Sequence, residues 1–191
     1  MKKLLCLFIL TSFSIWGQGE EAPGNGNGKY EEGTSEMQVY RVILNSRRAT
    51  YQHVADIVIM DRGEWDNFPT KEARRKQVTE LGIYDFSGVT NADEPTNHGA
   101  VAKAIMNQYE IPKGVLFWAF GFERYALKDL ANHRLVLPTY SEYSYIRGSA
   151  LVGMSTSADE FRTRKKNWGK SRMQMIIEET KKEQEELKNA Q

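Results

Sequence analysis

The chain has 191 residues, 26 Lys and Arg against 25 Asp and Glu, and a formal net charge of +1. This balance gives no sign of a nucleic-acid partner, because proteins that bind nucleic acids carry a strongly basic surface. Cys6 is the only cysteine, so disulfides, cysteine-ligated metals and thiol nucleophiles are excluded from the rest of the chain.

The first segment of the chain has the pattern of a secretory signal peptide. Residues 1–3 form a short positive start, residues 4–15 form an apolar run, and small residues follow at Gly17 and Gly19. The run is too short for a permanent membrane helix, which needs about 20 apolar residues. We expect residues 1–19 to be removed by cleavage after Gly19 or Gly17, and the protein to be exported to the periplasm or the cell surface.

Residues 20–36 are rich in Gly, Glu and Asn and offer little to bury, so we expect a disordered leader. Residues 37–44 are apolar, and their pattern allows either a short strand or the start of a helix. Residues 115–122 are strongly apolar and aromatic, and we expect a buried segment there, as helix or as strand.

Apolar residues recur at helical spacing through most of the remaining chain. This spacing predicts helices over residues 49–60, 69–81, 97–109, 123–133 and 144–155. Asn97 is expected to cap the third of these helices, and Gly82 to follow the end of the second. The predicted fold class is mainly α: a compact bundle of short helices over residues 37–157, followed by a long charged helix over residues 158–191.

Three segments about fifty residues apart share a local pattern, as stacked helical modules do. A basic residue or His, a small residue and apolar positions at helical spacing recur in Ser46–Tyr51, Asn97–Ala102 and Ile146–Leu151. A Leu-Gly-Ile turn at residues 81–83 precedes the second segment. Over residues 46–157 the chain therefore resembles the S-layer homology (SLH) domain of exported bacterial envelope proteins.

The resemblance implies a compact set of short helices in a pseudo-threefold arrangement and non-covalent attachment to cell-wall polysaccharide. It aligns Arg48 and Arg147 with the basic residue at the family's helix start, where the second segment has His98. The family's Glu is replaced by Ala100 in the second segment and by Ser149 in the third.

A polar and aromatic loop is the first candidate contact surface. Tyr140, Tyr143 and Tyr145 stand among serines, and tyrosine offers a large contact area with a hydrogen-bonding tip. A plain surface loop is the alternative interpretation of the same residues.

A basic stretch near the C-terminus is the second candidate. Arg164, Lys165 and Lys166 lie close to Trp168, and such a cluster fits an anionic envelope polymer, lipid headgroups or an acidic protein face. A solvated helix held by its own ion pairs is the alternative.

The acidic residues offer two further candidate functions, a calcium site and a glycan hydrolase. Asp61, Glu64 and Asp66 crowd a turn that can hold Ca²⁺, but the full calcium-loop pattern is missing, which favours a solvated turn. The same acids or Glu123 would suit a glycan hydrolase if two carboxyl groups lay about 5–10 Å apart in a cleft.

The remaining candidates are aromatic residues and histidines. The aromatic residues between positions 117 and 125 are expected in the core, with a sugar-stacking platform as the alternative. The three histidines show no metal-ligand spacing, so no metal or cofactor is expected.

Together these features favour a non-enzymatic exported envelope protein in a structural or attachment role. Its expected partner is a cell-wall polymer or an envelope protein assembly, with no nucleic acid and no transmembrane span. A glycan hydrolase with paired carboxylates is the alternative.

Overall fold

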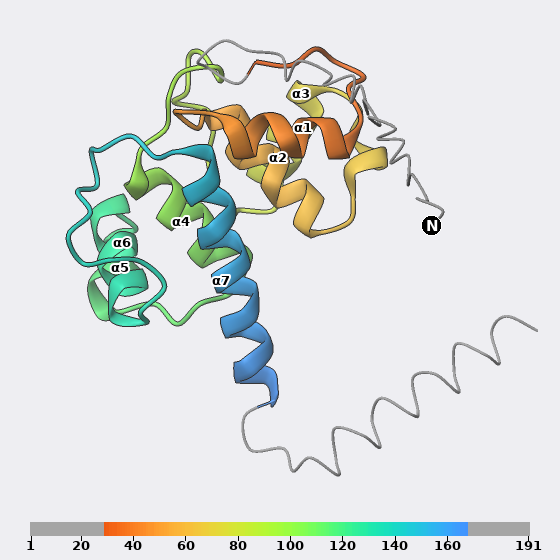
Figure 1. Cartoon of the computed structure of the whole chain (residues 1–191). Coiled ribbons are helices and arrows are strands. Elements are labelled where there is room, and N and C mark those ends of the chain that lie inside the picture. Colours follow the sequence, from red (N-terminus) through yellow and green to blue (C-terminus); the bar gives the residue numbers. More distant parts are fainter. Residues whose placement is uncertain (1–28, 168–191) are drawn as a thin grey trace, which may run out of the picture.

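The computed structural model describes residues 29–167, which fold almost entirely into helices and connecting loops (Figure 1). The elements are α1 (Glu36–Asn45), α2 (Tyr51–Asp61), the 3-10 turn η1 (Trp65–Asn67), α3 (Lys71–Glu80), α4 (His98–Gln108), α5 (Val115–Phe120), α6 (Glu123–Asn132) and α7 (Gly148–Asn167). The predicted mainly α class is confirmed. The predicted signal peptide and residues 20–28 of the predicted leader lie outside the described residues.

Side-chain caps fix the starts of the well-predicted helices. Thr50 and Asn97 accept hydrogen bonds from the backbone N–H groups of His53 and Ala100, at 3.3 and 2.8 Å. His53 returns the contact, because its Nδ1 accepts from the backbone N–H of Thr50 at 3.2 Å. Such caps satisfy backbone donors that have no partner inside the helix.

Residues 37–44, for which the sequence leaves two possibilities, form most of α1. Val39 and Ile43 are four residues apart, lie on one face of this helix and are fully buried. Within residues 29–167 no helix combines the length and apolar character needed to cross a bilayer.

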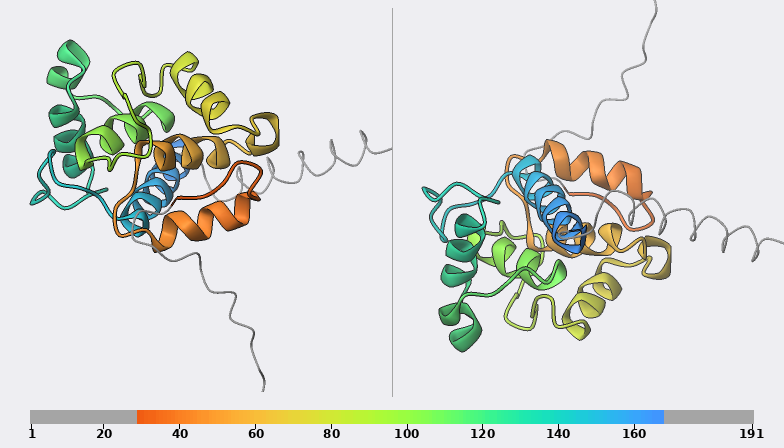
Figure 2. Two further views of the ribbon diagram at one scale, coloured as in Figure 1. Left: turned by 90° about the horizontal axis from the view of Figure 1, so that it is seen from above. Right: turned by 90° about the horizontal axis from the view of Figure 1, so that it is seen from below.

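Six of the seven described helices pack as three pairs around a common centre, and α5 packs on α6. α2 packs on α3, α4 on α6, and α7 on α1. Each pair joins a central helix (α2, α4 or α7) to an outer one. Within residues 29–167 the first helix, α1, packs on the last, α7, so the two ends of this part of the chain meet (Figure 2).

Three backbone hydrogen bonds join the starts of the central helices. The N–H of Ala49 donates to the carbonyl of Ile146 at 2.8 Å, and the N–H of Thr96 donates to the carbonyl of Ala49 at 2.8 Å. The N–H of Ile146 donates to the carbonyl of Thr96 over a longer distance of 3.5 Å. We call this closed set of three hydrogen bonds the ring. Each of these residues lies shortly before a central helix, so all three helices begin at one point.

This geometry corrects the alignment of the repeated segments. α2 and α4 are capped by Thr50 and Asn97, and α7 begins directly after Arg147. Arg48 therefore lies two residues before its cap, His98 lies one residue after its cap, and Arg147 occupies the cap position itself. The predicted equivalence of the three residues is wrong, because the capping residue rather than the nearest basic residue sets the register.

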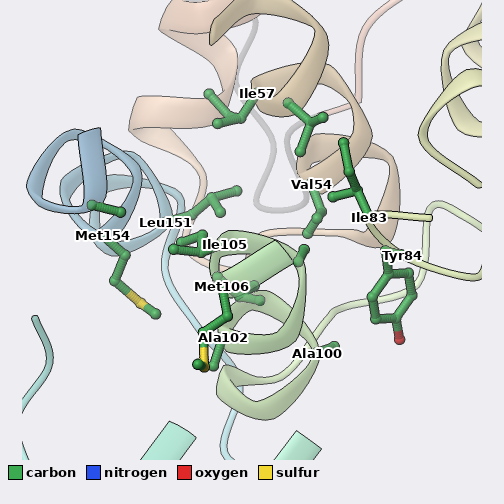
Figure 3. Packing of buried hydrophobic residues seen from close by; sticks show 14 of the residues in the cluster. Val54, Ile57, Ile83, Tyr84, Ala100, Ala102, Ile105, Met106, Leu151 and Met154 are labelled. Atoms are coloured by element: carbon green, nitrogen blue, oxygen red, sulfur yellow. The ribbon is translucent and has the colours of Figure 1, made fainter. Parts of the chain in front are cut away.

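The core lies where the three central helices face one another. Ile57 of α2, Ile105 and Met106 of α4, and Leu151 and Met154 of α7 are all buried at this junction (Figure 3). Beyond the ring, burial of these apolar side chains is what holds the helix pairs together.

α7 crosses the predicted boundary between the domain and the charged helix. It has 20 residues and is continuous through Ser157 and Ala158. Ala158 is fully buried, and Phe161 packs on the core from a half-buried position. The bundle therefore extends past residue 157, while residues 168–191 of the predicted charged helix lie outside the described residues.

Close contacts explain why small residues occur in the repeated pattern. A Cβ on Gly148 would lie 1.6 Å from the carbonyl oxygen of Ile43, and the Gly148 N–H donates to the carbonyl of Ser46 at 3.0 Å. A Cβ on Gly99 would lie 3.0 Å from the Cβ of Glu123. The first turn of α7 thus rests directly on the backbone at the end of α1.

Gly148→Ala should destabilise the fold by about 3 kcal/mol or more, because the backbone of α1 or α7 must move to admit a methyl group. Gly153→Ala is the matched control in the same helix, where a Cβ meets nothing within 4 Å. It should raise stability by up to about 1 kcal/mol through helix propensity. Urea unfolding of both variants measures the difference, and an unchanged Gly148→Ala protein would contradict the close contact.

Candidate functional site

The loop of residues 133–147 lies across the start of α4. The backbone N–H of His98 donates to the carbonyl of Ser144 at 3.0 Å, and the N–H of Gly99 donates to the carbonyl of Glu142 at 3.2 Å. These bonds use two of the free donors at the helix start, so the loop is fixed by backbone contacts before its side chains are considered.

The ring of His98 packs against the ring of Tyr140. The two rings are stacked with centroids 4.5 Å apart and an angle of 28° between their planes. His98 is only 6% exposed, and its Nδ1 lies 2.9 Å from the carbonyl oxygen of Ser144. The same Nδ1 lies 3.0 Å from the Ser144 hydroxyl oxygen, so two contacts with Ser144 hold the ring.

Arg48 supports Tyr145 in a similar way. The guanidinium carbon of Arg48 lies 4.8 Å from the centroid of the Tyr145 ring, within the range of a cation–π contact. Tyr143 lies between the two supported tyrosines in sequence and is 80% exposed. We call Arg48, His98 and the three tyrosines the tyrosine surface.

An open groove adjoins the tyrosine surface. It runs between α6 and the loop, and Arg124, Lys128, Asn132, Tyr140 and Glu142 supply its polar lining. Arg124 and Glu142 face each other at 3.8 Å. This mixture of cation, amide, phenol and carboxylate can hydrogen-bond a polar, hydroxyl-rich ligand.

The predicted binding residues near the start of α7 lie far from those near its end. Arg147 is exposed at the start of α7, whereas Arg164 and Lys165 are exposed near its end, about 25 Å away along the helix axis. Arg164 pairs with Glu160 of its own helix at 3.8 Å. Lys166 belongs to α7 without a described side chain, and Trp168 lies outside the described residues. The tyrosine surface and the basic stretch are therefore not one site.

Asp61 and Glu123, two of the acidic candidates, also lie apart. Asp61 accepts hydrogen bonds from Tyr109, just after α4, and from Ser155 of α7. Glu123 accepts from the hydroxyl of Tyr84 at 3.0 Å and packs beside Gly99, near the start of α4. The two acids thus contact residues at opposite ends of α4, a helix about 15 Å long.

Glu64 and Asp66 do not join Asp61 in a metal site. Glu64 pairs with Arg62 at 2.9 Å. Among residues 29–167 no group of three His, Cys, Asp or Glu side chains is arranged to hold a metal ion.

A buried polar cluster was missed at the sequence level. Asp56 is fully buried and accepts hydrogen bonds from Arg74 Nε and Gln52 Nε2, both at 2.8 Å, and from the Tyr30 hydroxyl. Arg74 is also buried and lies over the Trp65 ring at 4.1 Å. Burial and the neighbouring Asp56 carboxylate raise the pKa of Tyr30, so its hydroxyl stays protonated as a donor.

Tyr30 lies in the predicted disordered leader, so the ordered chain begins before the predicted domain start at residue 37. Lys71 strengthens this attachment, because its ammonium donates to the Tyr30 carbonyl at 2.6 Å. The cluster is enclosed, so it serves to fix the N-terminal segment on α2 and α3 rather than to meet a ligand.

The aromatic segment 115–122 was predicted to be buried, and this prediction is wrong for most of it. Phe117 alone among its large side chains is buried, at 4% exposure, while Trp118 is 79% exposed. Hydrophobic character in the sequence does not reveal which side of a short helix finds a partner in the fold.

Comparisons of this chain with protein-family models, with curated proteins and with solved structures find no match.

Asp56→Asn should lower the free energy of unfolding by about 3–5 kcal/mol, because it leaves the buried Arg74 guanidinium without its carboxylate partner. Glu80→Gln is the control, since it breaks an exposed pair with Lys76 at 3.8 Å and should cost about 0.5 kcal/mol or less. Thermal and urea unfolding compare the two. Equal losses would show that the Asp56 cluster is not held as described.

Proposed function

We propose that the chain is a diverged SLH-like protein that acts without catalysis and attaches to the cell envelope through the tyrosine surface. Support for the fold relationship comes from the three helix pairs and from the ring of Ala49, Thr96 and Ile146, since a pseudo-threefold set of short helices is what the resemblance implies. The pattern of residues 1–19 supports export to the periplasm or the cell surface.

The observation that carries the proposal is the support of two exposed tyrosines by partners from other segments. Tyr140 rests on His98 and Tyr145 on Arg48, so both rings are held in place before a ligand arrives. Preorganised aromatic side chains bind with little loss of conformational entropy. Their polar tips and the adjoining groove favour a hydroxyl-rich polymer, and we propose an envelope glycan as the ligand.

The positions of Asp61 and Glu123 favour binding over hydrolysis by this pair. A glycosidase needs two carboxyl groups about 5–10 Å apart on either side of the scissile bond. Asp61 and Glu123 are instead engaged by tyrosine hydroxyls near opposite ends of α4.

A sedimentation assay with isolated cell envelope tests the proposal. The double variant Tyr140→Ala/Tyr145→Ala should lower the apparent affinity about tenfold or more, as expected for two side chains at the centre of a binding surface. Tyr40→Ala is the control, because Tyr40 is a partly exposed tyrosine of α1 away from the loop. Unchanged binding by the double variant would contradict the proposal.

Charge removal in the full chain separates the loop from the basic stretch. The triple variant Arg164→Gln/Lys165→Gln/Lys166→Gln removes the cations of this stretch, whereas a cut after Ser157 would also remove the buried Ala158 and the half-buried Phe161. Binding retained by the triple variant supports the tyrosine surface, and binding lost by it at low salt contradicts it. Digestion of the wall polymer should abolish binding, whereas persistence would point to a protein assembly as the partner.

A further inference from the structure

A projecting apolar edge lies away from the tyrosine loop. Val115, Leu116, Trp118, Phe120 and Phe122 are each between 52% and 80% exposed. We call these five residues the aromatic ridge. They belong to α5 and the turn that follows it, at the outer edge of the molecule (Figures 1 and 2). Monomeric proteins seldom expose so many large apolar side chains together unless the patch binds something.

The ridge is held in a fixed shape. Phe117 anchors α5 in the core, and Asp129 of α6 accepts a hydrogen bond from the N–H of Gly114 at 2.8 Å. On the exposed side, the rings of Phe120 and Phe122 stack with centroids 5.9 Å apart. The apolar side chains therefore point outward from a docked helix.

Cations flank the ridge, while the nearby carboxylates point inward. Lys113 and Arg134 are exposed, and neither has an ion pair with any described residue. Glu123 is bound by the Tyr84 hydroxyl, and Asp129 by the backbone of Gly114. Both acids are only partly exposed.

The rest of the local charge leaves the flanks positive. Arg124 is balanced by Glu142 at 3.8 Å, and Glu110 adds one exposed carboxylate beyond the end of α4. Two exposed cations without ion pairs, Lys113 and Arg134, against one exposed carboxylate favour an anionic partner.

The composition of the edge favours lipid as the partner. Trp and Phe on a projecting edge with Lys and Arg beside them match elements that insert at the boundary of headgroups and acyl chains.

We propose that the aromatic ridge inserts into the interface of an anionic phospholipid bilayer, with Lys113 and Arg134 resting against the headgroups. This places the protein on a membrane surface by a contact separate from the tyrosine surface. The two surfaces together would bridge a membrane and an envelope polymer.

Flotation with vesicles tests the proposal. The chain from Glu20 onward is used, because the apolar run 4–15 would itself enter lipid, and every core residue of the fold is retained. It should float with vesicles of equal parts phosphatidylglycerol and phosphatidylcholine, and much less with phosphatidylcholine alone. Trp118→Ser/Phe122→Ser should weaken flotation about tenfold or more by removing the inserted rings.

Matched controls separate insertion of the aromatic ridge from nonspecific adsorption to the vesicles. Met37→Ser/Tyr40→Ser removes exposed apolar surface from α1 and should leave flotation unchanged. Lys113→Glu should weaken it about tenfold, whereas Lys76→Glu on α3 should not. Circular dichroism establishes that each variant is folded.

Several outcomes would overturn the proposal. One is absence of flotation by the parent chain, and another is equal flotation by the Trp118/Phe122 double variant. A third is a dimer in solution that the double variant loses, which would assign the ridge to a second copy of the chain. None of these results bears on binding of the envelope polymer, so failure here is distinct from failure of the proposed function.

Discussion

Three backbone hydrogen bonds among Ala49, Thr96 and Ile146 hold the starts of α2, α4 and α7 at one point. Because each residue lies shortly before its helix, the cycle fixes where the three helices begin and in which direction they leave. The apolar faces of the central helices then meet over their length, and the outer helices cover them in pairs. The steric limits at Gly99 and Gly148 follow from the same convergence, since neighbouring segments approach these helix starts closely.

The ring also accounts for the tyrosine surface. Residues 133–147 must return from α6 to the ring at Ile146, which carries the loop across the start of α4. On this path the loop meets His98 of the second segment and Arg48 of the first, and these two residues support Tyr140 and Tyr145. A surface composed from three distant parts of the chain thus follows from one backbone constraint, and the aromatic ridge stands apart from it on the short helix that precedes α6.

Local signals in the sequence predicted most of the helices, because a cap such as Asn97 and an apolar stripe act within a few residues. The same signals could not give the alignment of the repeats, since the nearest basic residue is easier to find than the residue that caps the helix. They also could not show that Trp118 and Phe122 are exposed, because burial depends on which neighbour the fold supplies. Tyr30 was assigned to the leader for the same reason: its partners, Asp56 and Arg74, are distant in sequence. The three tyrosines of the loop were predictable as residues, but their supports were not predictable as partners.

Native-state hydrogen exchange of backbone amides tests the central constraint most directly. If the ring organises the bundle, the amides of Ala49 and Thr96 should exchange only on global unfolding, with opening free energies equal to the unfolding free energy from urea. The amide of Tyr143, which has only a long contact of 3.4 Å to the Ser141 hydroxyl, should exchange far faster. Exchange of Ala49 and Thr96 at the rate of Tyr143 would contradict the account.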